Sequence, residues 1–404
     1  ALKSREGVPE SMSTKVLNFA LFPIALLTAS CGAADVGDSA ATPTPRAAEA
    51  VELEAGSPFM AEAHLDLDEG WALAIEPTTG NLLITEKAGT AKYFNPATGE
   101  ALSVSGLPTV AYGGQGGLGD VAFAPDYATS GTVYLSWAQA AEGSARRAVA
   151  GRGRLMCSAS ACEITGLREI WRQEPAIESA GHFSHKFAFS PDRQHLFISS
   201  GERMQGDPAQ DNSNNLGTIV RLNLDGTPAA GNPFASQPSP TNQIWSYGHR
   251  NIYGLQFDST GQLWDLEHGP RGGDELNRVA PGNNYGWPVR SNGNDYSGTD
   301  IPDHTADDGF TKPAIWWNPV IAPGGMIFYR GNMFADWRGQ ALIANLGSQT
   351  IVRVATNAAA GTATEEARYP FPRRLRDIEE AADGSLWVVE DGGNGRLLRL
   401  TPRI

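Results

Sequence analysis

Three groups of residues in this sequence could take part in chemistry. The first contains an imidazole, His182, which follows two small residues and stands just before an apolar segment. The unperturbed pKa of histidine is about 6.5, which suits proton abstraction near neutral pH, so His182 is a candidate general base. His185 lies close enough to compete for this role, and a single histidine without further context is more often structural.

The second group consists of cationic and amide side chains. Arg250 and Asn251 adjoin each other, whereas Arg374 and Arg376 alternate, so on an extended segment both guanidinium groups point the same way. Because two guanidinium groups on one face repel each other, an anionic ligand such as a planar polycarboxylate would suit their forked donors. The alternative is pairing with the acids nearby in sequence, which are Asp377, Glu379 and Glu380.

The third group is rich in oxygen ligands. Gly269 and Pro270 form a loop whose carbonyls can point into a site, and Asp274, Glu275 and the turn at residues 283–285 add further oxygen atoms. Calcium takes roughly six to eight oxygen ligands, including backbone carbonyls, so this segment is a candidate calcium site. The alternative is a solvated acidic loop, because the regular spacing of an EF-hand is missing.

Composition and missing motifs narrow the function further. The formal net charge of -14 argues against a nucleic-acid-binding surface, which needs a basic face. There is no phosphate-binding Walker loop, dinucleotide fingerprint, G-x-S-x-G elbow or H-E-x-x-H segment. Nicotinamide chemistry and serine hydrolysis are therefore disfavoured, and an anionic cofactor would need a local cluster of arginine or lysine.

The elements that must position these groups form a repeat. An apolar strand, a turn rich in Pro, Asp or Gly and a second apolar strand recur six times, beginning at Trp71, Gly119, Lys186, Ile252, Gly324 and Asp377. One such hairpin cannot bury its apolar face alone, and repetition around an axis solves this problem. The sequence therefore predicts an all-β fold, a six-bladed β-propeller over residues 58–404. The alternative, a β-sandwich, needs no common motif in its strands.

The repeat also predicts where the candidate site lies. The second strand of every hairpin ends at the same end of the molecule, so the loops that follow should converge near the axis. These loops are residues 201–203, 267–270, 345–347 and 390–391, with the segments that lead into each repeat beside them.

Residues 1–30 have the pattern of a signal segment, with Met12 as a natural start. Lys15 precedes an apolar run at residues 16–29, which is about the length of a signal core and short for a membrane span. Thr28 to Cys31 resembles a lipoprotein processing site that would leave a lipid anchor on Cys31; the alternative is an ordinary cleaved signal. Residues 31–57, rich in Ala, Thr and Pro, are predicted to be a flexible tether. Under both interpretations we expect the protein to be exported.

The two remaining cysteines, Cys157 and Cys162, suit a disulfide across a tight hairpin in an exported chain. Zinc binding is disfavoured because there is no second cysteine pair. The closed loop is short, so the stabilisation would be modest.

From about Trp71 to the C-terminus the sequence resembles the soluble, PQQ-dependent aldose (glucose-type) sugar dehydrogenases. These proteins are six-bladed propellers exported to the periplasm. The motifs that carry the resemblance are GQGGL at residues 114–118, GH at 181–182, GHRN at 248–251, EHGPRGGDE at 267–275, NYGWP at 284–288, APGGM at 322–326 and RLRD at 374–377.

The resemblance implies a role for each matching residue. His182 would be the general base that takes the proton of the sugar's anomeric hydroxyl as hydride passes to PQQ, and Gln115 would lie near the substrate. The carbonyls of Gly269 and Pro270 would hold a calcium ion that polarises the cofactor. Glu275 and the Tyr285 carbonyl would hold a second, structural calcium ion. PQQ would be clamped by Arg250, Asn251, Arg374 and Arg376.

The sequence departs from the family pattern at three places. Ser184-His185-Lys186 stands where Gly-Gly-Arg is usual, Gly347 replaces a PQQ-binding lysine, and Tyr253 sits where some members have glutamine. Loss of one lysine contact to a carboxylate would weaken PQQ affinity about tenfold to a hundredfold. Lys186 or His185 could compensate in part.

The implied function is PQQ- and calcium-dependent oxidation of an aldose sugar to its lactone in the periplasm. Electrons would pass to a separate acceptor, a cytochrome or a quinone. Two alternatives remain: a calcium-dependent sugar lactonase, since six-bladed propellers also host that activity, and a non-catalytic propeller that binds glycans or proteins. Lactonases place metal-binding carboxylates on the axis, whereas the axial loops here supply carbonyls and arginines.

Overall fold

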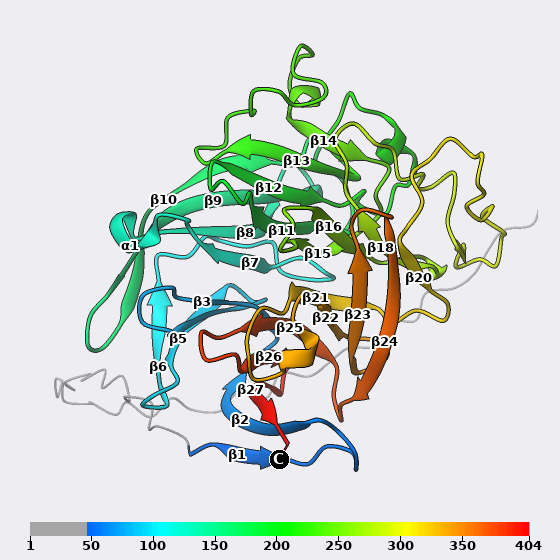
Figure 1. Cartoon of the computed structure of the whole chain (residues 1–404). Helices are drawn as coiled ribbons and strands as arrows, with labels where there is room; N and C mark the ends of the chain where they lie inside the picture. Colours follow the sequence, from blue (N-terminus) through cyan, green and yellow to red (C-terminus); the bar gives the residue numbers. More distant parts are fainter. Residues whose placement is uncertain (1–46, 404) are drawn as a thin grey trace, which may run out of the picture. The chain divides into compact units, whose positions relative to one another are not determined.

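The computed structural model describes residues 47–403, and nearly all regular structure in this part of the chain is β (Figure 1). The prediction of an all-β fold is confirmed. The short exceptions are α1 (Tyr127–Ser130), η1 (Asp207–Gln210), η2 (Thr241–Gln243) and η3 (Ala335–Trp337). No helix within residues 47–403 has the length and apolar character needed to cross a membrane. The predicted signal segment and Cys31 lie outside the described residues.

The strands form meandering antiparallel sheets. The first sheet joins two meanders through a parallel pairing of β10 with β6, and contains β3 (Gly70–Ile75), β4 (Leu82–Glu86), β5 (Thr90–Asn95), β6 (Glu100–Ser105), β7 (Leu118–Phe123), β8 (Thr132–Ala140), β9 (Arg146–Cys157) and β10 (Cys162–Arg172). The next sheet contains β11 (Ser184–Phe189), β12 (His195–Ser200), β13 (Thr218–Asn223) and β14 (Ile244–Tyr247).

Three further sheets follow along the chain. One contains β15 (Ile252–Phe257), β16 (Leu263–Glu267), β18 (Asp274–Arg278) and β20 (Ile315–Trp317). A small sheet pairs β17 (Arg271–Gly272) with β19 (Gly293–Asn294). Another contains β21 (Pro323–Phe328), β22 (Ala341–Asn345), β23 (Thr350–Asn357) and β24 (Thr362–Pro370).

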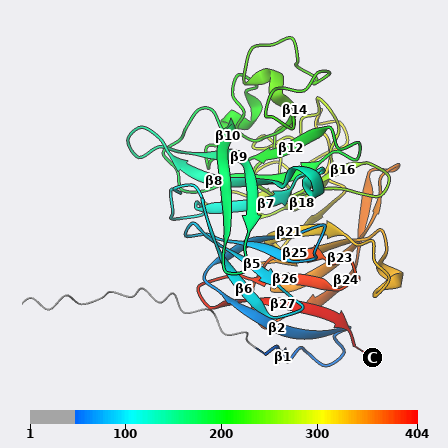
Figure 2. The same cartoon turned by 90° about the vertical axis from the view of Figure 1, so that its left-hand side faces the viewer.

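The last sheet combines both ends of the described segment. It contains β25 (Leu375–Glu380), β26 (Leu386–Glu390), β27 (Gly395–Pro402), β2 (Phe59–Leu67) and β1 (Glu49–Val51). The blue β2 lies beside the red β27 in both views (Figures 1 and 2), with Phe59 opposite Pro402. The predicted tether thus needs a correction: β1 pairs with β2, because Val51 and Leu53 are apolar and pack against the core around Phe59.

The six predicted hairpins are all present as antiparallel strand pairs: β3–β4, β7–β8, β11–β12, β15–β16, β21–β22 and β25–β26. The first strands of these hairpins contact one another in chain order, from β3 through β7, β11, β15, β21 and β25, and β25 contacts β3. These inner strands therefore surround a common axis.

Each inner strand has a register shift close to its beginning, for example between Gly70 and Ala72 in β3 and between Leu375 and Asp377 in β25. A bulge of this kind bends a strand and redirects its side chains, and bulges are common beside active sites. The same irregularity thus recurs around the axis, at the end where the candidate site was predicted.

The disulfide predicted between Cys157 and Cys162 is present. The two cysteines are opposite each other in the β9–β10 pair, with their Cα atoms 4.0 Å apart. The bond closes the tip of a long hairpin.

Candidate active site

The beginnings of the inner strands surround a cavity of about 370 Å³. Loops that are far apart in sequence meet here, as the repeat predicted. Side chains that border the cavity include Trp71, Lys87, Gln115, Tyr253, Arg374 and Arg376.

His182 is joined to Glu202, and its backbone contacts Gln115, which lines the cavity. Its Nδ1 contacts the Glu202 carboxylate, and both side chains are almost fully buried. Burial raises the pKa of Glu202, but the bonds from His182 and from the Gly206 N–H outweigh burial and lower its pKa overall. The carboxylate is therefore ionised and can only accept, so Nδ1 carries the proton and the lone pair is on Nε2.

Burial also lowers the pKa of His182 itself, and the neighbouring Arg250 lowers it further, while the hydrogen bond to Glu202 opposes both. The net shift is downward, so the imidazole is neutral at pH 7. A neutral imidazole with a fixed tautomer is what a general base requires. His185 differs from His182 because it is fully buried with its Nδ1 2.6 Å from the Ser136 hydroxyl.

The loop that carries His182 is held by Arg203. The buried guanidinium donates to the carbonyls of Gly181 (2.9 Å), Arg146 (2.7 Å) and Ser179, and lies 3.7 Å from the centre of the Phe183 ring. Three carbonyl acceptors match the forked donors of arginine. Arg203 thus fixes a loop in which His182 has a left-handed backbone (φ 48°).

Gln115 borders the cavity and is next to His182. Its Oε1 accepts a hydrogen bond of 2.7 Å from the His182 backbone N–H, and its own N–H donates to the Ala180 carbonyl at 2.7 Å. The Tyr253 hydroxyl is 3.5 Å from the same Oε1. Gln115 and Tyr253 therefore form the boundary of the cavity beside the imidazole.

Arg374 and Arg376 converge on one acid, Asp391. Arg376 donates to Asp391 Oδ1 from Nε (2.8 Å) and Nη2 (2.6 Å), and Arg374 Nε is 2.8 Å from Oδ2. Pairing with an acid was the alternative considered from the sequence, but the acid is not Asp377, Glu379 or Glu380. The register shift between Leu375 and Asp377 is the reason, because it separates the arginine side chains from the acids that follow.

Aromatic rings complete the wall next to Arg376. The guanidinium carbon of Arg376 is 4.5 Å from the Trp71 ring centre and 6.0 Å from that of Tyr253, and the two rings meet edge to face at 5.8 Å. Cations and flat rings together suit a planar, anionic ligand. The residues present therefore fit PQQ.

Arg250 and Asn251 do not border this cavity; Arg250 instead borders a small slot beside Gly269, where it meets the predicted calcium loop. Its Nη1 donates to the carbonyls of His268 (3.1 Å) and Gly269 (2.8 Å). The Gly269 carbonyl thus faces the positive charge of Arg250, and a carbonyl that holds calcium must also face a cation. Asn251 is buried, and its Oδ1 accepts a hydrogen bond of 3.1 Å from the Ser184 hydroxyl.

Glu275 and Tyr285 lie together at a slot of about 10 Å³ that Glu267 also borders. Burial and the nearby Glu267 raise the pKa of Glu275 well above its usual value. A buried carboxylate without a compensating cation fits a cation site.

Lys186 does not border the cavity of about 370 Å³ described above, which we call the cofactor cavity. Its Nζ is 3.0 Å from Asp120 and 3.3 Å from Asp377, in a second cavity further along the inner strands. The expected compensation by Lys186 or His185 is therefore wrong. Lys87 is the lysine at the cofactor cavity, where it pairs with Glu69 at 3.3 Å.

Glu202 and Lys87 were not identified as site residues from the sequence. Glu202 belongs to the 201–203 loop that the repeat placed near the axis, so its position was predicted although its role was not. Lys87 follows the second strand of the first hairpin, as the other axial loops follow theirs, and this common position is the signal that could have identified it.

Comparison with known proteins gives a consistent result. The family model described as Glucose / Sorbosone dehydrogenase matches residues 67–399. The aldose sugar dehydrogenase YliI of Escherichia coli is 36% identical over 342 residues, which cover 83% of this chain and 91% of that protein.

Solved structures agree with the sequence comparison. The apo-form crystal structure of the soluble aldose sugar dehydrogenase from Escherichia coli has a TM-score of 0.80 at 35% identity, covering 85% of this chain and all of the other. The PQQ-bound aldose sugar dehydrogenase of Streptomyces coelicolor has a TM-score of 0.67 at 27% identity, covering 89% of this chain and 100% of the other.

Proposed function

Since this chain belongs to the glucose/sorbosone dehydrogenase family, we propose that it oxidises an aldose sugar at the anomeric carbon to the lactone, with PQQ and calcium as cofactors. One observation carries the proposal. A neutral histidine with a fixed tautomer, His182, contacts Gln115, and Gln115 lines a cavity that Trp71, Tyr253 and two arginines also border. A base beside a site for a planar anion is the arrangement that this reaction requires.

Different residues of this chain have different roles in the proposed reaction. Nε2 of His182 accepts the proton of the anomeric hydroxyl, while Glu202 keeps the other proton on Nδ1 and stabilises the imidazolium that forms. PQQ, when bound, supplies the two-electron acceptor for the hydride. Gln115 lies beside the base and would orient the sugar. The electrons then leave to a separate acceptor, a cytochrome or a quinone.

The cofactor would be bound mainly by charge. Arg374 and Arg376 would exchange part of their pairing with Asp391 for the carboxylates of PQQ, and Arg250 and Asn251 would complete the clamp. The PQQ-bound form of the similar protein from Streptomyces coelicolor supports PQQ as the cofactor. Calcium would be held by the Gly269 and Pro270 carbonyls, and a second ion by Glu275 and the Tyr285 carbonyl.

The proposal includes six propeller blades over residues 58–404. Six hairpins of one pattern and the closed order of contacts among their first strands support this count. It also includes export to the periplasm, with a lipid anchor on Cys31. The disulfide between Cys157 and Cys162 supports export, because such bonds persist in oxidising compartments.

One experiment tests the function. The purified protein is supplied with PQQ and calcium, and reduction of an artificial electron-acceptor dye is measured with a panel of aldoses. We expect reduction that requires PQQ and is lost in His182→Gln. Hydrolysis of sugar lactones without PQQ would favour the lactonase alternative, and inactivity in both assays would favour a non-catalytic binding protein.

A further inference from the structure

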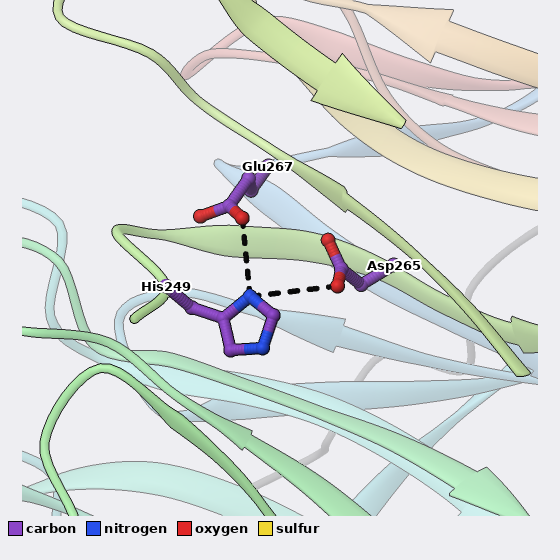
Figure 3. A group of neighbouring side chains, drawn as sticks. All are labelled: His249, Asp265 and Glu267. Atoms are coloured by element: carbon purple, nitrogen blue, oxygen red, sulfur yellow. Dashed lines mark hydrogen bonds and ion pairs between the residues drawn. The ribbon is translucent and has the colours of Figure 1, made fainter. Parts of the chain in front are cut away.

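A second cluster of ligating side chains lies beneath the GHRN loop. His249 Nδ1 is 3.1 Å from Glu267 Oε1 and 3.5 Å from Asp265 Oδ2 (Figure 3). The three ligand atoms lie within 4.8 Å of one another, and all three residues are buried. Asp265 and Glu267 alternate along β16, so both carboxylates point to the same face of the strand.

The cluster has more negative charge than the protein compensates. Asn277 Nδ2 lies between three carboxylates, at 3.2 Å from Asp265, 3.0 Å from Glu267 and 3.4 Å from Glu275. One amide group has only two hydrogens, so it cannot satisfy three acids. The guanidinium of Arg250 is close in sequence but donates to the His268 and Gly269 carbonyls instead.

One carboxylate oxygen shows directly that positive charge is lacking in this cluster. Asp265 has no solvent-exposed surface, and its Oδ2, which faces His249 Nδ1, has no hydrogen-bond partner within the described residues. Buried charges are normally hydrogen-bonded, paired or bound to a metal, because an uncompensated one is strongly destabilising. An unpartnered carboxylate oxygen directed at an imidazole nitrogen indicates a missing cation.

The spacing of the ligand atoms fits a small metal ion. Bonds of about 2.0–2.1 Å to nitrogen and oxygen place tetrahedral ligand atoms about 3.3 Å apart. The two contacts of His249 Nδ1, at 3.1 and 3.5 Å, lie on either side of this value. The other ring nitrogen, Nε2, is 2.9 Å from the Ser246 hydroxyl, and metal-bound histidines usually have such a second partner.

We propose that His249 Nδ1, Asp265 and Glu267 bind one divalent transition-metal ion of the zinc class. The imidazole ligand distinguishes this site from the two calcium sites, whose ligands are all oxygen. The ion would link the loop before β15 to β16, and it does not depend on PQQ.

The test uses the full chain without a polyhistidine tag and without PQQ. The protein is stripped with a chelator, Zn²⁺ is added in competition with a chromophoric chelator, and bound metal is counted by mass spectrometry after desalting. We expect about one tightly bound Zn²⁺ per chain in the wild type and an affinity lower by about a hundredfold in Asp265→Asn. Asp258→Asn is the control, because Asp258 is also buried but bonds Trp264 outside the cluster.

A measurement on the wild type alone guards against a variant that fails to fold. Co²⁺ or Cu²⁺ bound at the proposed site should show nitrogen coupling from one imidazole in pulsed paramagnetic resonance. Failure of the wild type to retain Zn²⁺, the same affinity in Asp265→Asn as in the wild type, or a bound ion without nitrogen coupling would each overturn the proposal.

Discussion

The inner strands border two cavities of similar size and opposite character. The cofactor cavity, about 370 Å³, contains Arg374, Arg376 and Lys87, each paired near the surface with a single acid. The second cavity, about 440 Å³, contains Lys186, which is buried between two acids. Tyr253 borders both.

The difference concerns which charges are available to a ligand. Lys186 lies between Asp120 and Asp377, and those acids also accept the backbone N–H groups of Phe187 and Leu73. These bonds tie four inner strands together. In the cofactor cavity two guanidinium groups share one acid, so cationic donors exceed acceptors. We infer that one cavity binds an anion and the other stabilises the ring of strands.

The largest expected effect separates catalysis from binding in the cofactor cavity. His182→Gln removes the base but keeps a side chain of similar size, so we expect kcat to fall about a thousandfold. PQQ affinity, measured by fluorescence titration, should stay close to the wild-type value. The matched control is Glu379→Gln in the second cavity, which should leave kcat unchanged.

The second prediction concerns the other cavity. Lys186→Met leaves Asp120 and Asp377 buried without their cation, so the free energy of unfolding should fall by about 3–5 kcal/mol. Urea denaturation checks the value. PQQ affinity of the folded variant should be unchanged, and a clear loss of affinity would contradict the separation of the two cavities.

Glu202→Gln tests how the base is held. We expect kcat to fall on the order of a hundredfold, because the tautomer and orientation of His182 are no longer fixed. Activity needs the neutral imidazole, so the rate is lost as pH falls through the pKa of His182. Glu202 raises this pKa, so its removal should move the acidic limb of the pH–rate profile to lower pH. A limb that stays in place would show that Glu202 has no such role.

Arg376→Gln removes the guanidinium that lies over Trp71 and is largely buried. PQQ affinity should fall about tenfold to a hundredfold, the range for one lost charged hydrogen bond. Arg374 is half exposed, so Arg374→Gln should have the smaller effect. Equal losses for both variants would argue against this distinction between buried and exposed donors.

The smallest expected effect is a gain in PQQ affinity. Asp391 holds both arginines in the absence of ligand, so it competes with an anionic cofactor. Asp391→Asn should therefore tighten PQQ binding, by about tenfold at most. Asp383→Asn, which removes another acid paired with an arginine, is the control and should leave the affinity unchanged. Weaker binding in Asp391→Asn would show that Asp391 supports the clamp.

The sequence predicted the hairpins because their apolar strands and Pro, Asp or Gly turns are local signals. It also brought His182 and the arginines together through the repeat, whereas Gln115 came from the family resemblance. It did not predict that Asp391 pairs with the arginines, because a bulge near the start of β25 turns Asp377 toward Lys186 instead.

The misplacement of Lys186 has a similar cause. Ser184 and His185 have left-handed backbones, with φ of 58° and 57°, and a register shift separates Ser184 from Phe187. A left-handed backbone at non-glycine residues is uncommon and cannot be inferred from side-chain types. The pairing of His182 with Glu202 could not be predicted from the sequence either. It joins two loops, and the local backbone angles decide which of their side chains face each other.

The most direct test of the central claim is a single turnover. Protein loaded with PQQ and calcium is mixed with excess aldose, and reduction of the bound quinone is followed by its absorbance without any external acceptor. We expect a rapid, stoichiometric reduction in the wild type and a rate about a thousandfold lower in His182→Gln with PQQ still bound. A loaded wild type that no aldose reduces, or a His182→Gln variant that reacts at the wild-type rate, would contradict it.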